Sequence, residues 1–358
     1  MISDIVKIAL PGTIAFIVGV LLAPPLAGWL YRRQMWKKQP KTIATDGRGT
    51  PIFSKLHETR ETTTPKLGGL LIWGSTLITV VGIWFISQIF DNEVVNKVDF
   101  LSRSQTWLPL FAMVIGGIVG FTDDLLDIRG AADHIAGGLS LSKRLLVVGL
   151  IGLLAALWFY TKLETQTIGI PFVGDIDLGF LFVPFFIIVM LALYSGGVID
   201  GLDGLAGGIF ATMFSAYAGI AFFQDQINLA AFCVSVVGAL LAFLWFNIPP
   251  ARFYMSETGS MALTVSLAVV AFMTDSLSEG HGVFVLPIIA FPLVVTTASV
   301  IVQLVSKKFR NGKKVFMVAP LHHHFEALGW PPYKVVMRYW VFGAVVAIIG
   351  LIIGVIGQ

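Results

Sequence analysis

Three carboxylates stand within five residues of one another, directly after an apolar run. Asp123, Asp124 and Asp127 follow the run Leu108–Val119. Because an ionised carboxylate is costly inside hydrocarbon, we expect these side chains to lie at or just beyond a membrane edge. Ionised acids supply the oxygen ligands that Mg²⁺ and the diphosphates it bridges prefer. The alternative interpretation is a solvated helix end where acids are merely tolerated.

Two further acids lie in a glycine-rich segment that has no basic residue. The segment Tyr194–Gly208 contains Asp200 and Asp203. Gly201 and Leu202 lie between the two acids, and further glycines follow. Glycine lets backbone approach a ligand closely, and the acids can bind a metal ion or accept hydrogen bonds from sugar hydroxyls. A calcium-binding loop would need more acids and a closing glutamate, which are missing. A structural turn is the alternative.

The segment Phe246–Ser260 offers both oxygen ligands and aromatic rings. Asn247 and Glu257 carry side-chain oxygens, and Phe253 or Tyr254 carries a ring on which a nucleobase could stack. Aromatic residues are also common at membrane interfaces, which is the favoured interpretation for the neighbouring Trp245.

Three consecutive histidines, His322, His323 and His324, lie in a segment between two apolar runs. Consecutive helical residues point in different directions, so one metal ion rarely binds all three. Cysteine partners and a His-X₃-His spacing are absent, which argues against structural zinc. Proton transfer, or hydrogen bonding to phosphate and nucleotide, fits this segment better.

Basic residues that could neutralise phosphate stand close to these motifs. The turn Thr64–Gly69 includes Lys66, and Arg60 precedes it; such a turn can bind phosphate oxygens, but the pattern alone favours a simple loop-to-helix junction. After the first acidic cluster, either Lys143 or Arg144 could reach a phosphate near Asp123.

The composition indicates the class of protein that carries these residues. Of the 358 residues, 56% are hydrophobic and 13% are charged, and the mean hydropathy is +0.85, which indicates an integral membrane protein rather than a soluble domain. The single Cys233 lies in an apolar run, where we expect it to serve packing. Nothing indicates a nucleic-acid partner.

Ten apolar runs predict ten transmembrane helices: Ile8–Leu30, Leu67–Ile89, Leu108–Phe121, Leu145–Tyr160, Leu178–Leu193, Ile209–Phe223, Leu229–Trp245, Met261–Thr274, Val283–Leu304 and Val335–Ile356.

The basic residues are strongly biased to one side of the predicted membrane. Alternate loops carry nineteen Lys and Arg residues, and the loops on the opposite side carry three. The positive-inside rule places the first set in the cytoplasm and both termini outside. We therefore predict an all-α polytopic protein in which residues 1–358 form a single domain. Its active site is expected in the cytoplasmic loops 31–66, 122–144, 194–208, 246–260 and 305–334.

Taken together, the motifs resemble a known family. The pair Asp123-Asp124, the stretch Asp200–Ala206, and Asn247 with the stretch Glu257–Ser260 are similar to the polyprenyl-phosphate N-acetylhexosamine-1-phosphate transferases. The stretch Met317–Pro331, which includes the histidines, is similar to members that transfer phospho-MurNAc-pentapeptide. Ser256-Glu257 stands where the family pattern has Gly-Asp, and Lys66 stands where it has Thr.

The resemblance implies a chemistry and a set of roles. It implies transfer from UDP-MurNAc-pentapeptide to undecaprenyl phosphate, with Mg²⁺ as cofactor, by a homodimer in the bacterial cytoplasmic membrane. We expect the metal at Glu257 and Asp203. The expected catalytic residues are Asp123, Asp124, Asp200, Asp203, His323 and His324, and the expected substrate contacts are Lys66, Lys143, Gly201, Leu202, Asn247, Tyr254 and His322.

Two alternatives remain beside this interpretation. A sister transferase would use UDP-GlcNAc as donor. A transporter of lipid-linked sugars would place ionisable groups near the membrane midplane, often in two repeated halves. The ten runs lack central charges, and no repeat is evident, which disfavours transport.

Overall fold

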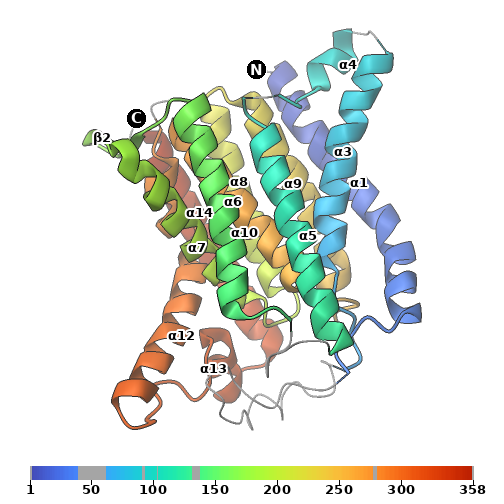
Figure 1. The fold of residues 1–358 in the computed structure, drawn as a ribbon. Coiled ribbons are helices and arrows are strands. Elements are labelled where there is room, and N and C mark those ends of the chain that lie inside the picture. The colour runs from blue at the N-terminus through green and yellow to red at the C-terminus, as the bar shows by residue number, and fades with distance from the viewer. Residues whose placement is uncertain are drawn as a thin grey trace.

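The computed structural model describes residues 2–38, 62–90, 93–102, 104–130, 138–276 and 280–356. In these ranges the protein is a helical bundle with ten helices that are long and apolar enough to cross a membrane (Figure 1). The described elements are α1 (Ile2–Arg32), α3 (Gly69–Ile89), α4 (Glu93–Val98), α5 (Trp107–Arg129), α6 (Leu141–Lys162), β1 (Thr167–Ile170), β2 (Gly174–Asp177), η1 (Gly179–Leu181), α7 (Phe182–Ser195), η2 (Gly196–Ile199), α8 (Leu205–Phe223), α9 (Ile227–Asn247), α10 (Ser256–Ser276), α11 (Gly282–Ile289), α12 (Phe291–Phe309), α13 (Leu321–Ala327) and α14 (Pro332–Ile356). The all-α membrane architecture predicted from the sequence is confirmed.

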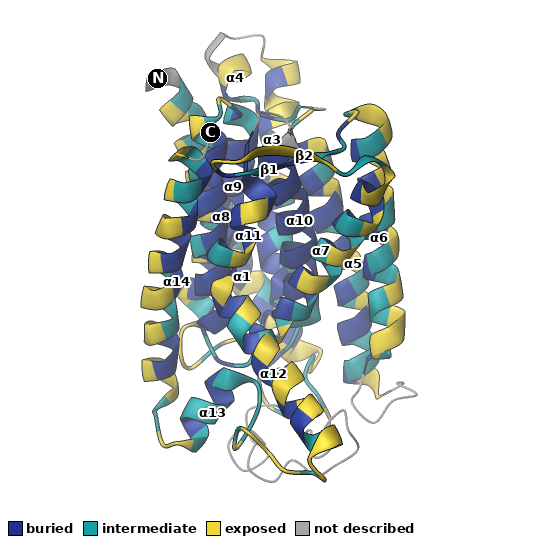
Figure 2. Cartoon of the chain, turned by 90° about the vertical axis from the view of Figure 1, so that its left-hand side faces the viewer, coloured by how far each residue is buried: buried dark blue, intermediate teal, exposed yellow. Residues whose placement is uncertain are grey.

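Helix α10 forms the centre of the bundle. In its most apolar stretch 94% of the residues are buried, against 22% for the peripheral α1 and α14 (Figure 2). Its buried hydroxyl side chains have hydrogen-bond partners, because Thr264 and Thr274 donate to main-chain carbonyls one turn earlier and Ser266 donates to the Pro109 carbonyl of α5 at 3.0 Å. The central helix can therefore carry polar residues without leaving their hydrogen bonds unmade.

The outer helices expose apolar side chains, as a surface in contact with lipid does. Leu21 of α1, Leu154 of α6, Ile301 of α12 and Val341 of α14 are each more than half exposed. In Figure 2 yellow positions recur along the visible faces of α6, α12 and α14. Because hydrocarbon tails are as apolar as these side chains, they incur no penalty there.

The two termini lie at the same end of the bundle, at the top of Figure 1. This agrees with an even number of spans. The assignment of that end to the extracytoplasmic side stays a prediction from charge. The short antiparallel hairpin of β1 and β2 lies at this end as well, and Asp275 accepts a hydrogen bond from its Gly169 N–H at 2.9 Å.

Three helices differ most from the apolar runs that predicted them. Helix α5 does not end at Phe121 but continues to Arg129, where Gly130 terminates it at φ 64°. Helix α10 begins at Ser256, five residues before its apolar run. Both extensions are polar segments that tertiary contacts hold in helical form, so hydropathy alone does not reveal them.

The predicted ninth span is the third difference, because the run Val283–Leu304 is divided into α11 and α12. The division falls at Ala290, and Pro292, which has no N–H to donate, follows at the start of α12. In Figure 1 the orange α12 leaves the bundle at this point and extends beyond its lower end.

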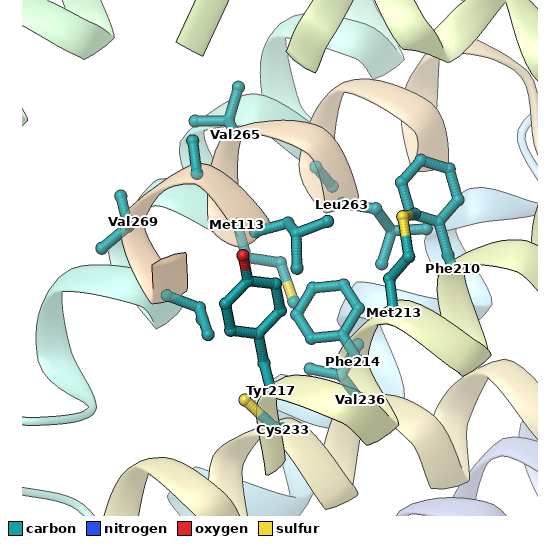
Figure 3. Close-up of a cluster of buried hydrophobic side chains, with 14 of the residues drawn as sticks. Met113, Phe210, Met213, Phe214, Tyr217, Cys233, Val236, Leu263, Val265 and Val269 are labelled. Atoms are coloured by element: carbon teal, nitrogen blue, oxygen red, sulfur yellow. The ribbon is translucent and has the colours of Figure 1, made fainter. Parts of the chain in front are cut away.

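The core lies where α5, α8, α9 and α10 meet. Figure 3 shows Met113, Phe214 and Leu263 from three of these helices converging, with Cys233 beside Tyr217. Cys233 is fully buried and has no disulfide, so its predicted role in packing is confirmed.

Candidate functional site

The acidic end of α5 lies against the first turn of α10 because the two helices approach closely at Gly120. A Cβ atom at Gly120 would lie 2.1 Å from the carbonyl oxygen of Glu257, so no other residue fits there. Asp123 and Asp124 follow on the next turn of α5, and both are buried. The carboxylates predicted in a loop are therefore held in the last turns of α5, and this end of α5 is at the lower end of the bundle in Figure 1.

Asp124 caps the start of α10 from the neighbouring helix. Its carboxylate accepts hydrogen bonds from the Thr258 main-chain nitrogen at 2.8 Å, the Thr258 hydroxyl at 2.7 Å and the Ser256 hydroxyl at 2.8 Å. The first turn of a helix has unpaired N–H groups and a positive dipole end, so a carboxylate is stabilised there. This arrangement fixes Asp124 and orients the residue between its two partners, Glu257.

Lys66 neutralises the other side of the same carboxylate. Its ammonium lies 3.1 Å from Asp124 and 2.5 Å from Asp127, and Lys37 lies 3.3 Å from Asp127. Burial disfavours the charged form of Lys66, but the two carboxylates outweigh that effect and raise its pKa above the ordinary value. Lys66 is therefore a permanent cation beside the acids.

Arg144, in the first turn of α6, contacts both Asp123 and Glu257. Its Nε lies 3.1 Å from Asp123, and its Nη1 donates to Glu257 at 2.7 Å. The Leu139 main-chain N–H also donates to Asp123, at 2.6 Å. Asp123 and Asp124 are adjacent in sequence, yet they have different partners because successive helical residues point about 100° apart.

The loop between η2 and α8 brings in the second pair of acids. Asp200 accepts a hydrogen bond from Ser256 N–H at 2.8 Å, and Asp203 accepts one from Ala251 N–H at 3.1 Å. Burial raises the pKa of Asp200 to about 6; the Ser256 hydrogen bond opposes the shift, and the charge of Asp124 adds to it. Such a carboxyl exchanges protons close to neutral pH.

The histidine helix α13 packs against this loop. A Cβ at Gly201 would lie 2.3 Å from Nε2 of His322 and 2.8 Å from Nε2 of His323, so only glycine permits the contact. Both rings are buried, and Nδ1 of His323 lies 2.6 Å from the carboxylate of Glu326. His324 faces elsewhere, where its Nδ1 accepts from Met317 N–H at 3.2 Å. The three rings do not converge on one point, as expected for consecutive residues.

Comparison with known proteins bears on this arrangement of acids and histidines. A family model described as glycosyl transferase family 4 matches residues 106–275. The phospho-N-acetylmuramoyl-pentapeptide-transferase of Listeria monocytogenes serovar 1/2a is 34% identical over 94% of this chain and 95% of its own length. Proteins of the same name from Anoxybacillus flavithermus and Geobacillus sp. are 36% and 34% identical, over 96% and 99% of both chains.

This chain belongs to the phospho-N-acetylmuramoyl-pentapeptide-transferase family. The resemblance predicted from the motifs is thereby confirmed. The relatives match nearly the whole chain, so membership includes the α13 segment that the glycosyl transferase family 4 model does not reach.

Three departures from the transferase pattern lie together in the structure. Lys66, in place of a threonine, forms the ion pairs with Asp124 and Asp127, and Ser256, in place of a glycine, donates to Asp124. Glu257, in place of an aspartate, reaches Arg144. All three substituted positions therefore contact the same group of acids and their counter-charges.

Several predicted substrate contacts have partners inside this transferase chain. Asn247 accepts a hydrogen bond from Gly204 N–H at 2.9 Å and donates to the Phe253 carbonyl at 2.8 Å, so its amide holds two loops together. The Tyr254 main chain pairs with Pro65 and Gly68, at 2.8 Å each, which positions Lys66. The substrate-binding roles of Asn247 and Tyr254 stay predictions.

Lys143 and Leu202, two further predicted substrate contacts, differ in their exposure. Lys143 is exposed, whereas Arg144, the alternative named for the same role, is the one that enters the cluster. Leu202 is buried. Arg60 lies outside the described residues. Phe253, the alternative to Tyr254, is fully buried between Phe243 and Phe246 and has no face open to a base.

The sequence interpretation left out several residues of the cluster. Asp127 was noted in the first motif and Ser256 as a departure from the family pattern, but neither was assigned a role. Thr258, Lys37 and Glu326 were not singled out. Asp127 lies one helical turn from Asp123 and Asp124, so a longer α5 would have indicated it. Nothing local to Lys37 distinguishes it from the other basic residues of its loop.

Proposed function

We propose that this chain transfers phospho-MurNAc-pentapeptide from UDP-MurNAc-pentapeptide to undecaprenyl phosphate, which forms lipid I and releases UMP. We place it in the cytoplasmic membrane of a bacterium, with the site facing the cytoplasm, as a homodimer. Family membership supports the reaction. The observation that carries the proposal is the gathering of acids, cations and histidines, from distant parts of the sequence, at one end of a lipid-exposed bundle.

The geometry suits phosphoryl transfer, which depends on positioning and charge neutralisation more than on covalent chemistry. An oxygen of the lipid phosphate attacks the phosphorus attached to the sugar, and the bond from that phosphorus to the UMP oxygen breaks. A phosphate monoester has a second pKa near 6, so the attacking group is already mostly dianionic at neutral pH. We therefore assign to Asp123 the orientation of the lipid phosphate rather than a covalent role.

We assign the histidine helix α13 to the donor substrate. His322 and His323 are the rings closest to Gly201, and Glu326 holds the ring of His323 from behind. We assign to this pair hydrogen bonds to the donor phosphate or nucleotide; Asp200 directly precedes Gly201, the residue that the two rings contact. Detection of a phosphorylated enzyme in a single turnover would overturn the direct attack.

The acids have the chemistry that a magnesium ion requires. Among the described residues, the six acids Asp123, Asp124, Asp127, Asp200, Asp203 and Glu257 are accompanied by three cations, Lys37, Lys66 and Arg144, so negative charge is in excess. Hard oxygen donors with excess negative charge fit Mg²⁺. Within the described residues no three acid or histidine side chains are already gathered around one point as metal ligands are, so Glu257 and Asp203 would hold the ion together with oxygens of the diphosphate. When bound, the ion would neutralise charge on the diphosphate.

The test uses the full-length protein purified in detergent with both substrates. We expect release of UMP and formation of lipid I with Mg²⁺, and neither product after chelation. Asp123→Asn and Glu257→Gln should lower turnover by at least about a hundredfold, whereas the exposed Asp225→Asn should not. Turnover with UDP-GlcNAc in place of the pentapeptide donor would favour the sister transferase. Absence of UMP with either donor would contradict both, and chemical cross-linking tests the homodimer.

A further inference from the structure

Arg144 lies between two carboxylates that come from different helices. Its guanidinium contacts Asp123 of α5 at 3.1 Å and Glu257 of α10 at 2.7 Å. The Arg144 side chain is 20% exposed, and those of Asp123 and Glu257 are 2% and 27% exposed. A planar guanidinium can serve two carboxylates at once, which an ammonium does less well.

The position of Arg144 is fixed by its own helix as well as by the acids. Ser140 caps α6 by accepting from the Lys143 main-chain nitrogen, so the helix begins at Leu141 and Arg144 lies in its first turn. Arg144 also donates from Nε to the Leu139 carbonyl at 3.0 Å, and the side chain of Tyr194 hydrogen-bonds to it. The guanidinium is therefore built into the site rather than extended into solvent.

The two acids need such a cation. The close approach at Gly120 forces Asp123 and Glu257 together, and like charges in a partly buried site repel strongly. Lys66 does not serve here, because its ammonium is engaged by Asp124 and Asp127. Arg144 thus supplies the positive charge between Asp123 and Glu257.

Under the proposed function, Glu257 is also a ligand of the divalent cation, together with Asp203. Glu257 cannot give the same oxygen to the guanidinium and to a metal ion without weakening both contacts. We propose that Arg144 is the resident counter-cation of the Asp123–Glu257 pair and competes with the divalent cation for Glu257. Binding of the ion releases the guanidinium from Glu257, and the released group is then available to the phosphates of the donor. This inference rests on the proposed function.

The proposal predicts that loss of the Arg144 charge strengthens the binding of a metal ion. Removing a positive charge from the site, as in Arg144→Gln, should tighten binding of a divalent cation by about tenfold or more, because a competitor is lost. If the metal ion instead bound too far from the Arg144 guanidinium to compete with it for Glu257, binding of the metal alone would be unchanged. Lys143→Gln is the matched control, since it removes the same charge one residue away from an exposed side chain. Metal affinity should not change in that variant.

The measurement is titration of the purified full-length protein with Mn²⁺ alone, followed by electron paramagnetic resonance and isothermal calorimetry. Arg144→Lys provides a second variant should Arg144→Gln fail to fold, because an ammonium keeps the charge but cannot hold both acids. Its Mn²⁺ affinity should exceed that of the wild type, by less than for Gln. Equal or weaker Mn²⁺ binding in either folded variant, or no binding in any, overturns the proposal. Because no substrate is present, failure of the wild type to release UMP would instead contradict the proposed function.

Discussion

The carboxylate of Asp124 on α5 accepts two hydrogen bonds from Thr258 in the first turn of α10, at 2.8 Å from the nitrogen and 2.7 Å from the hydroxyl. One buried acid thus joins two helices and fixes the direction of Glu257. The same carboxylate receives Lys66, so it has a partner on each side. Asp124 has no oxygen left without a hydrogen bond or ion pair, and we infer that it positions the site rather than reacting.

Asp124→Asn should destabilise the protein. The change leaves Lys66 with one carboxylate instead of two and weakens a charge-assisted cap, which costs about 2–4 kcal/mol. Thermal unfolding in detergent measures this loss. Asp225→Asn, which removes an exposed acid from a turn, is the control and should shift stability by less than about 0.5 kcal/mol. An Asp124→Asn protein as stable as the wild type would show that the cap is unimportant.

Gly201→Ala should reduce activity more than stability. The added methyl group would lie 2.3 Å from the ring of His322, so either the loop or α13 must move by about 1 Å. A displacement of that size costs on the order of a hundredfold in turnover. Gly149→Ala is the matched control, because nothing lies within 4 Å of the added carbon there. Normal turnover in Gly201→Ala would mean that the histidines need not touch this loop.

Asp200→Asn should stabilise the protein at neutral pH. Burial raises the pKa of Asp200 from 3.8 to about 6, so the folded state binds the proton more tightly than the unfolded state does. Stability from this group is therefore full below pH 4 and is lost as the pH rises through 6. The asparagine, which can still accept from Ser256, avoids that loss of about 1–3 kcal/mol.

The check on Asp200 is the difference in unfolding free energy between wild type and Asp200→Asn, measured from pH 4.5 to 7.5. The advantage of the variant should be largest at pH 7.5 and should shrink toward pH 4.5. A difference that is independent of pH would show that the buried charge of Asp200 is not its cause. Turnover should fall in the variant at every pH, if the ionised carboxylate takes part in the reaction.

Glu326→Ala should lower turnover through the ring of His323. The carboxylate lies 2.6 Å from Nδ1 and holds the imidazole with its Nε2 toward Gly201. Without it, the ring can rotate, and we expect a loss on the order of tenfold in kcat with little change in KM. Glu326→Gln should recover part of the loss, because an amide can still hydrogen-bond to Nδ1. Equal effects of Ala and Gln would argue that charge, not orientation, is the contribution of Glu326.

Much of the fold followed from local properties of the sequence. Apolar runs of membrane-spanning length predicted ten helices because each run has to be buried in lipid or protein wherever it lies. The structure has ten such helices in its described ranges. The motifs Asp123-Asp124, Asp200–Asp203 and His322–His324 were recognisable because their residue types are unusual beside apolar runs. Where helices end in polar sequence, as α5 does at Arg129, hydropathy carried no information.

Only the tertiary structure decided which residue contacts which. Arg144 rather than Lys143 entered the cluster because Ser140 starts α6 at one particular residue, and each residue turns the side chain by about 100°. Asp123 and Asp124 acquired different partners for the same reason. The crossing of α5 and α10 at Gly120 then determined that Arg144 would meet Glu257, 113 residues further along the chain. Residue type is a local property of the sequence, whereas the pairing of charges depends on how distant helices cross.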